Sequence, residues 1–234
     1  MRLDQFLVDQ KLTETRAKAK DLINRGFVFV NGHAISKASY DVKQEDLIKI
    51  EKEFQFVSRG GDKLNQFLMD LKLDIKDNIC IDVGASTGGF TQVLLLRGAK
   101  KVITYDVGSD QLHDSLRNLH HVEVHESTNI LDVRIPKHDL MVIDVSFTSV
   151  LPILKHIAPH VDTVIVLVKP QFEQISQYKD IIRDEKTRMH LLNHVQKEMM
   201  HIGFEIIDAK DASIQGKKGN QETLYLLKMK GSHA

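Results

Sequence analysis

Four charged residues stand at or just past the ends of apolar runs in this chain of 234 residues, where they could do chemistry. They are Asp82, Asp106, Asp144 and Lys169. The apolar runs before them are typical of buried strands, and the carboxyl ends of parallel strands meet at one edge of a sheet, where ligands bind. The sequence therefore predicts that three carboxylates and one amine converge on a ligand at one edge of an α/β sheet.

A glycine-spaced turn follows the first of these runs. Its spacing is G-x-x-x-G-G rather than the G-x-G-x-x-G of dinucleotide sites, and Asp82 before it would repel a phosphate. Asp106 could accept both hydroxyls of a ribose, so the turn suits a nucleoside. It resembles the S-adenosylmethionine loop of Rossmann-like methyltransferases; an ordinary tight strand–helix turn is the alternative. The resemblance implies cofactor contacts from Asp82, Gly84, Ala85, Ser86, Gly88, Gly89, Phe90, Asp106 and Asn129.

The elements that would position these residues alternate along the chain. Such alternation predicts a parallel sheet covered by helices on both faces. A helix from Lys63 to Leu71 is expected after a flexible lead-in at residues 58–61. A long helix from Asp184 to His201 is expected to bury Met189, Leu192, Val195 and Met199. Strands are predicted over residues 79–83, 102–105, 122–125, 140–143, 164–168, 204–208 and 223–229, the last two as a closing hairpin.

The first part of the chain predicts a separate small module. A short amphipathic helix over residues 2–10 precedes a second helix, for which Thr13 is the expected N-cap and which Gly26 ends. Asn31-Gly32 between short apolar runs predicts a hairpin. Together these features resemble the S-four-type (alpha-L) RNA-binding module, a small α+β fold. We therefore expect one domain over residues 1–57 and a Rossmann-like α/β methyltransferase domain over 58–234.

Basic residues gather on the second helix of this module. A cationic helix is by itself most often a solvated face. In S-four-type modules, however, this helix and the adjacent hairpin lie on the RNA backbone, where binding releases counterions from phosphates. The resemblance therefore favours RNA over the solvated face. The candidate RNA contacts are Arg2, Arg16, Lys18, Lys20, Arg25 and Arg59.

Composition narrows the class of protein without indicating a partner. Lys plus Arg and Asp plus Glu both number 32, so net charge alone does not indicate nucleic acid. No apolar run reaches the roughly 18 to 20 residues of a membrane span, and Met1-Arg2-Leu3 does not begin a signal-peptide pattern. Cys80, the single cysteine, fits a reducing cytosol. We expect a cytoplasmic protein that binds no membrane and, since no histidine spacing suits a ligand set, no metal.

The turn Asp144-Val145-Ser146-Phe147 bears on which group is methylated. Enzymes that methylate exocyclic base amines resemble one another in an Asp/Asn-Pro-Pro-aromatic turn at this place, and the proline pair is missing here. Methylation at C5 of a pyrimidine needs a cysteine nucleophile, and Cys80 lies upstream of the glycine turn. Both routes are therefore poorly supported.

Four residues resemble, in order and placement, the Lys-Asp-Lys-Glu tetrad of the FtsJ-like RNA 2′-O-methyltransferases: Lys63, Asp144, Lys169 and Glu222. With the N-terminal module, nearly the whole chain resembles the TlyA (haemolysin A) family of ribosomal RNA 2′-O-ribose methyltransferases. The resemblance implies S-adenosylmethionine-dependent 2′-O-methylation of cytidines, the tetrad as catalytic residues, and ribosomal RNA or ribosomal subunits as partners. The motifs that carry it are Ser58-Arg59-Gly60-Gly61-Asp62-Lys63-Leu64, the glycine turn from Asp82 to Thr91, Val142-Ile143-Asp144-Val145-Ser146-Phe147, Leu167-Val168-Lys169-Pro170-Gln171-Phe172-Glu173 and Gly219-Asn220-Gln221-Glu222.

The role of Lys169 within the tetrad stays open at this level. A lysine must lose its proton to act as a base; Lys63 nearby would favour that loss, whereas Asp144 and Glu222 would oppose it. Lys169 therefore either accepts the hydroxyl proton itself or stays charged. A charged Lys169 would stabilise the developing alkoxide while Asp144 takes the proton.

The resemblance leaves several alternatives open. They are an RNA- or ribosome-binding protein with a silent methyltransferase fold, a small-molecule O-methyltransferase, and a membrane-active haemolysin, which only the family's historical name suggests. The family is also expected to carry a glycine-rich segment after Glu173, and residues 174–184 lack it. The target nucleotide, the ribosomal subunit and the oligomeric state are not indicated by the sequence.

Overall fold

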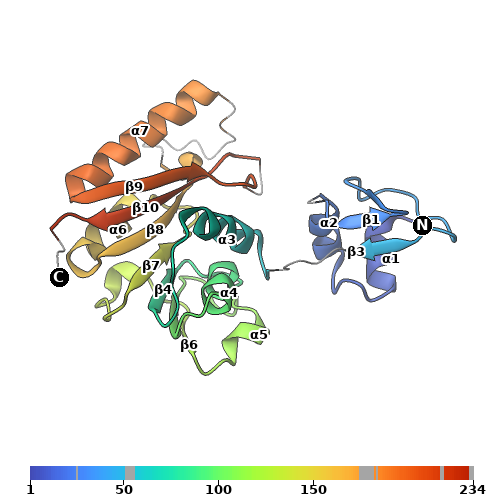
Figure 1. The fold of residues 1–234 in the computed structure, drawn as a ribbon, viewed down its shortest axis with the longest axis horizontal. Helices are drawn as coiled ribbons and strands as arrows, with labels where there is room; N and C mark the ends of the chain where they lie inside the picture. Colours follow the sequence, from blue (N-terminus) through green and yellow to red (C-terminus); the bar gives the residue numbers. More distant parts are fainter. Residues whose placement is uncertain (25, 51–55, 174–181, 183, 217–218, 232–234) are drawn as a thin grey trace. The chain divides into compact units, whose positions relative to one another are not determined.

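A computed structural model describes the chain except for residues 25, 51–55, 174–181, 183, 217–218 and 232–234 (Figure 1). The chain divides into two compact units, Met1–Gln55 and Phe56–Ala234. Residues 174–184, where the family is expected to carry a glycine-rich segment, lie almost entirely outside the described residues. We describe each unit by itself.

The N-terminal unit packs two helices against a small sheet. Leu3 and Leu7 of the first helix are fully buried, as the amphipathic pattern predicts. Asn31 and Gly32 both have positive φ angles, 51° and 81°, which is the backbone of a two-residue hairpin turn. The sheet has the order β2-β1-β3 and is antiparallel. The elements are α1 (Leu3–Asp9), α2 (Arg16–Asn24), β1 (Val28–Val30), β2 (His33–Ala34) and β3 (Ile48–Ile50).

The second helix begins later than predicted. The Thr15 hydroxyl, not Thr13, accepts a hydrogen bond from the backbone N–H of Lys18, so Thr15 satisfies the free donors at this helix start. Thr13 is instead buried, and its hydroxyl has no hydrogen-bond partner among the described residues. The prediction of Thr13 as N-cap was therefore wrong. Thr13 and Thr15 are equally good N-cap residues by type, and only the fold shows that Thr13 is buried while Thr15 stands at the helix start.

The C-terminal unit is built on a seven-stranded sheet with the order β6-β5-β4-β7-β8-β10-β9. The five strands from β4 to β8 pair in parallel, and β10 pairs antiparallel with both β8 and β9. This confirms the predicted parallel sheet with a closing hairpin. The strands are β4 (Ile79–Val83), β5 (Lys101–Tyr105), β6 (Val122–His125), β7 (Leu140–Ile143), β8 (Thr163–Val168), β9 (Phe204–Asp211) and β10 (Thr223–Met229).

Helices cover both faces of this sheet (Figure 1). Alternate residues of β4 divide between two cores: Ile81 packs with α6 and α7, and Cys80 packs with α3 and α4. The sheet is therefore the middle layer of three, and its strand ends face a rim that loops can line. The helices are α3 (Arg59–Leu71), α4 (Gly89–Leu96), α5 (Asp114–Arg117), α6 (Leu151–Ile157) and α7 (Glu185–Ile202), with short 3-10 turns η1 (Ile130–Asp132), η2 (Ala158–His160) and η3 (Pro170–Phe172).

Two helix predictions were wrong in detail. The lead-in at residues 58–61 was expected to precede the helix, but α3 already starts at Arg59 and includes both glycines. A Cβ at Gly61 would stand 2.5 Å from Phe56, so the glycine leaves room for that side chain. In α7, Met189 is 42% exposed rather than buried. Arg188 occupies the inward face instead, because its guanidinium reaches Asp211 and Thr223.

Candidate active site

The turn between β4 and α4 brings the backbone close to the end of a neighbouring strand. Gly84 has a φ of 81°, and a Cβ there would stand 2.6 Å from the carbonyl oxygen of Asp144. Gly89 begins α4, where a Cβ would overlap the hydroxyl of Ser58. These glycines permit close approach at two places, so the turn lies directly beside the end of β7 and the start of α3.

A cavity of about 420 Å³ opens beside this turn. Asp106 lies on its wall, just past β5, and accepts hydrogen bonds from the backbone N–H groups of Ser86 (2.8 Å) and Gly108 (2.7 Å). Asn129 also lines the cavity, and its side chain accepts from the N–H of Leu131. The wall thus combines a fixed carboxylate with apolar groups such as Ile130 and Ile153, as small-molecule pockets do, and its volume is large enough for a ligand the size of a nucleoside.

A smaller cavity of about 150 Å³ adjoins the first. The two share Gly84, Ser86, Asp144 and Ser146 in their walls, so a ligand can extend from one into the other. Lys169 lines only the smaller cavity. Its Nζ lies 2.6 Å from Oδ1 of Asp144 and donates a hydrogen bond to Oγ of Ser146 at 2.8 Å.

Lys63 and Glu222, which are 159 residues apart, form a second ion pair at the same rim. Nζ of Lys63 lies 2.5 Å from Oε2 of Glu222, and the side chains are only 7% and 4% exposed. Thr223 pairs with Val168 across the β8–β10 ladder, which places Glu222 beside Lys169. On the other side, Gly60 lies one helical turn before Lys63, and a Cβ at Gly60 would stand 3.3 Å from Oδ2 of Asp144.

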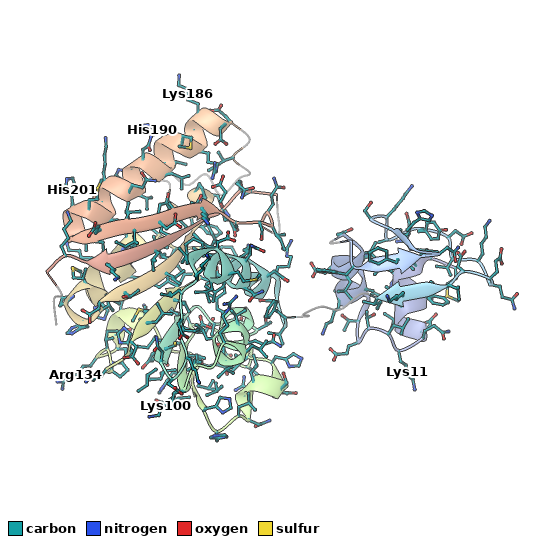
Figure 2. The ribbon with its side chains drawn as sticks, in the orientation of Figure 1. Lys11, Lys100, Arg134, Lys186, His190 and His201 are labelled. Atoms are coloured by element: carbon teal, nitrogen blue, oxygen red, sulfur yellow. The ribbon has the colours of Figure 1, made fainter. Side chains whose placement is uncertain are left out.

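These two lysines differ from most other cations of the unit, although Arg188 is also enclosed with carboxylates. Lys100, Arg134 and Lys186 are exposed and project into solvent (Figure 2). Lys63 and Lys169, at 7% and 11% side-chain exposure, are instead enclosed with carboxylates. Burying a charge is costly unless it is paired. The Lys169–Asp144 pair lies in the wall of the smaller cavity, and an enclosed ion pair in such a place is typical of functional sites. Lys63 and Glu222 line neither of these two cavities.

Two predicted cofactor contacts stand outside both cavities. Asp82 is fully buried and accepts a hydrogen bond from the Thr91 hydroxyl at 2.6 Å. Burial, with smaller contributions from the charges of Asp144 and Asp106, raises the pKa of Asp82 to about 7. Gly88 has a φ of 93° and faces Leu112 and Leu116 rather than either cavity. The other predicted cofactor residues, namely Gly84, Ala85, Ser86, Gly89, Phe90, Asp106 and Asn129, all line one cavity or both.

The predicted RNA contacts separate into different settings. In the N-terminal unit, Arg2, Arg16 and Lys20 lie around Asp4, whereas Lys18 pairs with Glu14 at 3.6 Å. Arg59 begins α3 in the C-terminal unit. Arg25 lies outside the described residues.

Sequence reasoning missed an exposed aromatic ring at the cavity rim. Phe147 lines the larger cavity and is 78% exposed, with a φ of 65° that a bulky residue rarely adopts. Its ring packs against Phe172 with centroids 5.3 Å apart. An exposed ring of this kind can stack on a nucleic-acid base. The spacing from Asp144 was the only available signal, because exposure and backbone angle are properties of the fold.

The strand order, the glycine turn and the carboxylate beside a nucleoside-sized cavity together define an α/β enzyme of the methyltransferase class. Comparison with known proteins agrees. Residues 56–229 match the FtsJ-like methyltransferase family, and residues 1–48 match the S4 domain. The chain belongs to the FtsJ-like methyltransferase family, with an S4 domain at its N-terminus.

Relatives match the chain over nearly its whole length. Hemolysin A of Brachyspira hyodysenteriae is 37% identical over 96% of this chain and 98% of the relative. The 23S rRNA (cytidine-2′-O)-methyltransferase TlyA of Campylobacter jejuni is 34% identical over the same shares. A solved structure from Streptococcus thermophilus, described as a hemolysin, is 35% identical and covers 99% of this chain and 89% of its own, with a TM-score of 0.75. Within the described residues, no helix is both long and apolar enough to cross a membrane.

Proposed function

We propose that this protein transfers a methyl group from S-adenosylmethionine to the 2′-hydroxyl of a cytidine in ribosomal RNA. The observation that carries the proposal is the pairing of Lys169 with Asp144 and of Lys63 with Glu222 beside a nucleoside-sized cavity. The relative from Campylobacter jejuni, named a 23S rRNA (cytidine-2′-O)-methyltransferase, supports the same substrate class.

The cavity residues suit the proposed cofactor. Asp106 offers a carboxylate to the ribose hydroxyls, and its position is held by two backbone N–H groups. Gly84 leaves room for a close approach where any Cβ would strike the backbone of Asp144. Asn129 and Ile130 line the part of the wall that suits the adenine ring. When bound, the cofactor supplies an electrophilic sulfonium methyl group whose C–S bond breaks, with its electron pair staying on sulfur.

Asp144 and Lys169 would have different roles toward the acceptor hydroxyl, one as proton acceptor and the other as a positive charge. The carboxylate of Asp144 accepts the 2′-hydroxyl proton as the new O–C bond forms, and it becomes a neutral acid. The Lys169 ammonium, held by Asp144 and Ser146, orients the hydroxyl and stabilises negative charge on its oxygen. The Lys169 amine lies 2.6 Å from the Asp144 carboxylate, so the two groups are already in ion-pair contact at the place where this assignment needs them.

Lys63 and Glu222 would complete the electrostatic setting. The pair is enclosed and neutral as a whole, so it adds no net charge to the site. Its fixed dipole would contribute a preorganised field at the point where the proton leaves the hydroxyl. Removing either partner would leave a buried charge without compensation.

Kinetics of Lys169→Ala and Asp144→Asn test this function. Each variant should lower the rate of methyl transfer to unmodified ribosomal RNA by about 100-fold or more, with cofactor affinity changed little, since one proton acceptor or one oxyanion partner is lost. Ribose methylation is read as a nuclease-resistant dinucleotide with tritiated cofactor. Wild-type protein that binds the cofactor but methylates neither ribosomal RNA nor subunits would contradict the proposed function.

The pH dependence separates the two roles open to Lys169. If Asp144 is the base, Lys169→Arg keeps a positive charge and should retain more activity than Lys169→Ala, with an unchanged acidic limb of the pH–rate profile. If Lys169 is the base, arginine cannot replace it, and both variants should be equally inactive.

A further inference from the structure

A buried carboxylate organises the basic face of the N-terminal unit. Asp4 lies in the first turn of α1, and its side chain is completely buried. A buried carboxylate is costly unless it is paired and hydrogen-bonded. Three cations provide that pairing, and they come from the residue before α1 and from α2.

The contacts give this cluster a defined geometry. Arg2 donates from Nε to Oδ1 (3.0 Å) and from Nη2 to Oδ2 (3.2 Å) of Asp4, a two-pronged contact. Arg16 donates from Nη2 to the same Oδ2 at 3.0 Å, and Nζ of Lys20 lies 3.9 Å from it. Hydrogen bonds from Arg2, with Arg16 adding to them, lower the pKa of Asp4 to about 2, so the carboxylate is ionised at neutral pH.

The cations themselves remain open to solvent. The side chains of Arg2, Arg16 and Lys20 are 47%, 53% and 51% exposed, while Asp4 beneath them is fully covered. Each guanidinium carries five N–H donors, and Asp4 uses only two from Arg2 and one from Arg16. Three positive charges and one negative charge leave a surplus of two, in a chain whose overall formal charge is zero.

We propose that Asp4 is a positioning residue that holds Arg2, Arg16 and Lys20 as a preformed site for RNA phosphates. This inference rests on the proposed function, because it takes RNA as the substrate. Without the carboxylate, three like charges would repel one another, and each long side chain would have to be ordered when RNA binds. With it, much of that ordering is complete in the free protein, so less affinity is lost on binding.

Removing the charge of Asp4 is expected to weaken RNA binding, whereas total charge alone would predict tighter binding. Asp4→Asn removes one negative charge, as does Asp9→Asn, and Asp9 is an exposed residue of the same helix. If only total charge mattered, each variant would bind RNA as tightly as wild type or slightly more tightly. If Asp4 positions the cations, Asp4→Asn should weaken binding by about three- to tenfold, while Asp9→Asn stays at or above wild-type affinity.

Binding is measured with fluorescently labelled, unmodified 23S ribosomal RNA transcript, without cofactor, from about 50 to about 300 mM KCl. The slope of log affinity against log salt should fall by about one for Asp4→Asn, since about one phosphate contact is lost. Asp4→Asn that binds as tightly as Asp9→Asn, with an unchanged salt slope and a folded N-terminal unit, would overturn the proposal.

If Asp4→Asn fails to fold, as judged by limited proteolysis, two charge-conserving substitutions test whether the cluster is a preformed RNA site. Arg16→Lys keeps the charge but loses the planar fork, whereas Lys11→Arg keeps the charge at an exposed residue between α1 and α2 that is neither part of the cluster nor a candidate RNA contact. The proposal expects at least a threefold loss of affinity for Arg16→Lys and no change for Lys11→Arg; equal affinities would overturn it. Affinity is read separately from methyl transfer, so a wild type that binds RNA without methylating it contradicts the proposed function alone.

Discussion

Gly216 shows how a single residue without a side chain can hold a charged group in place. A Cβ at this position would overlap Oε1 of Glu222 and lie 3.1 Å from its Cδ. The backbone of Gly216 is itself fixed, since its N–H donates to the carbonyl of Asn220 and its carbonyl accepts from Gly219. The Glu222 carboxylate therefore lies between this loop and Lys63.

We expect Gly216→Ala to reduce catalysis more than binding. The added methyl group would push Glu222 away from Lys63 and leave a buried ammonium without its partner. Because neither Gly216 nor Glu222 lines the nucleoside-sized cavity, cofactor affinity should change by less than about twofold, while kcat falls by about tenfold or more. Single-turnover methylation and cofactor titration separate the two quantities. An unchanged kcat in a folded variant would show that the exact position of Glu222 does not matter.

Asp82 makes the stability of the C-terminal unit depend on pH. Its pKa in the folded protein is raised to about 7 from 3.8, chiefly by burial, so the folded state holds a proton that the unfolded state has released. The contribution of this residue to stability is therefore fully present below about pH 4 and is lost as pH rises through about 7. Asp82→Asn keeps an amide oxygen for the Thr91 hydroxyl but cannot ionise.

The difference between the two proteins should follow that curve. Urea unfolding from about pH 4.5 to about pH 8 should show wild type losing stability relative to Asp82→Asn as pH rises. Thr91→Val, which removes the hydrogen bond but leaves the carboxyl group, serves as the control and should retain the pH dependence. If the free energies of unfolding of wild type and Asp82→Asn differ by the same amount across this pH range, Asp82 stays ionised despite its burial.

The residues of the site were predictable from sequence to different degrees. Asp106 and Lys169 stand at strand ends, and periodicity alone places them at the rim. Lys63 and Glu222 lie in segments with no such signal, and only the family resemblance brought them together. Gly216 and Phe147 could not be found, because what matters is a contact or an exposure that exists only after folding.

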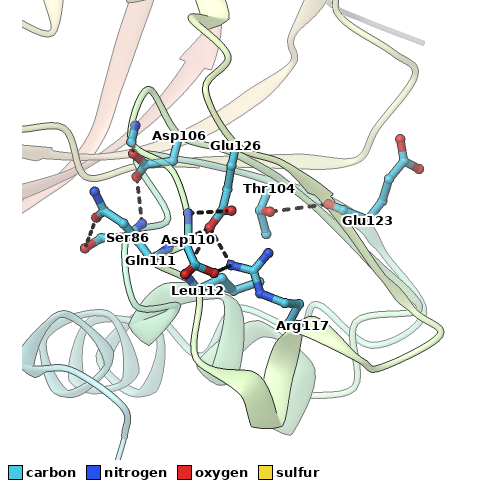
Figure 3. A network of polar contacts seen from close by, with 10 residues as sticks. Ser86, Thr104, Asp106, Asp110, Gln111, Leu112, Arg117, Glu123 and Glu126 are labelled. Atoms are coloured by element: carbon cyan, nitrogen blue, oxygen red, sulfur yellow. Dashed lines mark hydrogen bonds and ion pairs between the residues drawn. The ribbon is translucent and has the colours of Figure 1, made fainter.

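At the scale of elements, residues 110–112, in the segment after β5, are held by one carboxylate. Glu126, just past β6, accepts backbone hydrogen bonds from Asp110 (2.8 Å), Gln111 (2.8 Å) and Leu112 (3.1 Å), as Figure 3 shows. Arg117 donates to the same carboxylate at 2.7 Å. Hydrogen bonds from Arg117 and these N–H groups lower the pKa of Glu126 to about 2.

This segment forms part of the wall of the nucleoside-sized cavity, so Glu126→Gln should weaken cofactor binding. A glutamine can accept on its amide oxygen but not on its nitrogen, and it has no charge to attract Arg117. We expect cofactor affinity to fall by about three- to tenfold with little change in kcat, measured by calorimetry and saturating kinetics. Glu123→Gln, in the preceding strand β6 and paired with Lys101 and His125, is the matched control. Equal affinities of the two variants would contradict this role.

Element boundaries were predictable where local chemistry decides them. The sheet strands are predicted within one residue over β4 to β8 and in β10. Most of them are apolar runs between polar residues or glycines, and β6 alternates apolar and polar residues. The start of α3 was missed because Gly60-Gly61 reads as flexible, whereas the structure uses these glycines for close contact with Phe56 and Asp144. Glycine has both uses, and only the neighbours distinguish them.

At the scale of the whole molecule, the hydrophobic cores follow the division into two units. One core lies among residues 3–50, built on Leu3, Leu7 and Ile23. The other two lie wholly within residues 56–229, on the two faces of the large sheet. Each unit therefore buries its own apolar surface, which is what independent folding requires.

Phe56 marks where the second unit begins, one residue past the division at Gln55 and two before the boundary predicted from sequence. It is 6% exposed and packs in the core under α3, where Gly61 makes room for its ring.

We expect the fragment 56–234 to fold with nearly the melting temperature of the corresponding transition in the full chain. Phe56→Ala should lower that temperature by about 5 to 15 °C, because a large core ring is lost. The loss should be equal in the fragment and in the full chain, since the core that holds Phe56 contains no residue of the first unit. Calorimetry of the four proteins measures this, with Leu47→Ala, an exposed residue of the N-terminal unit, as the control in the full chain. A fragment that does not fold, or a Phe56→Ala effect confined to the full chain, would show that the first unit stabilises the second.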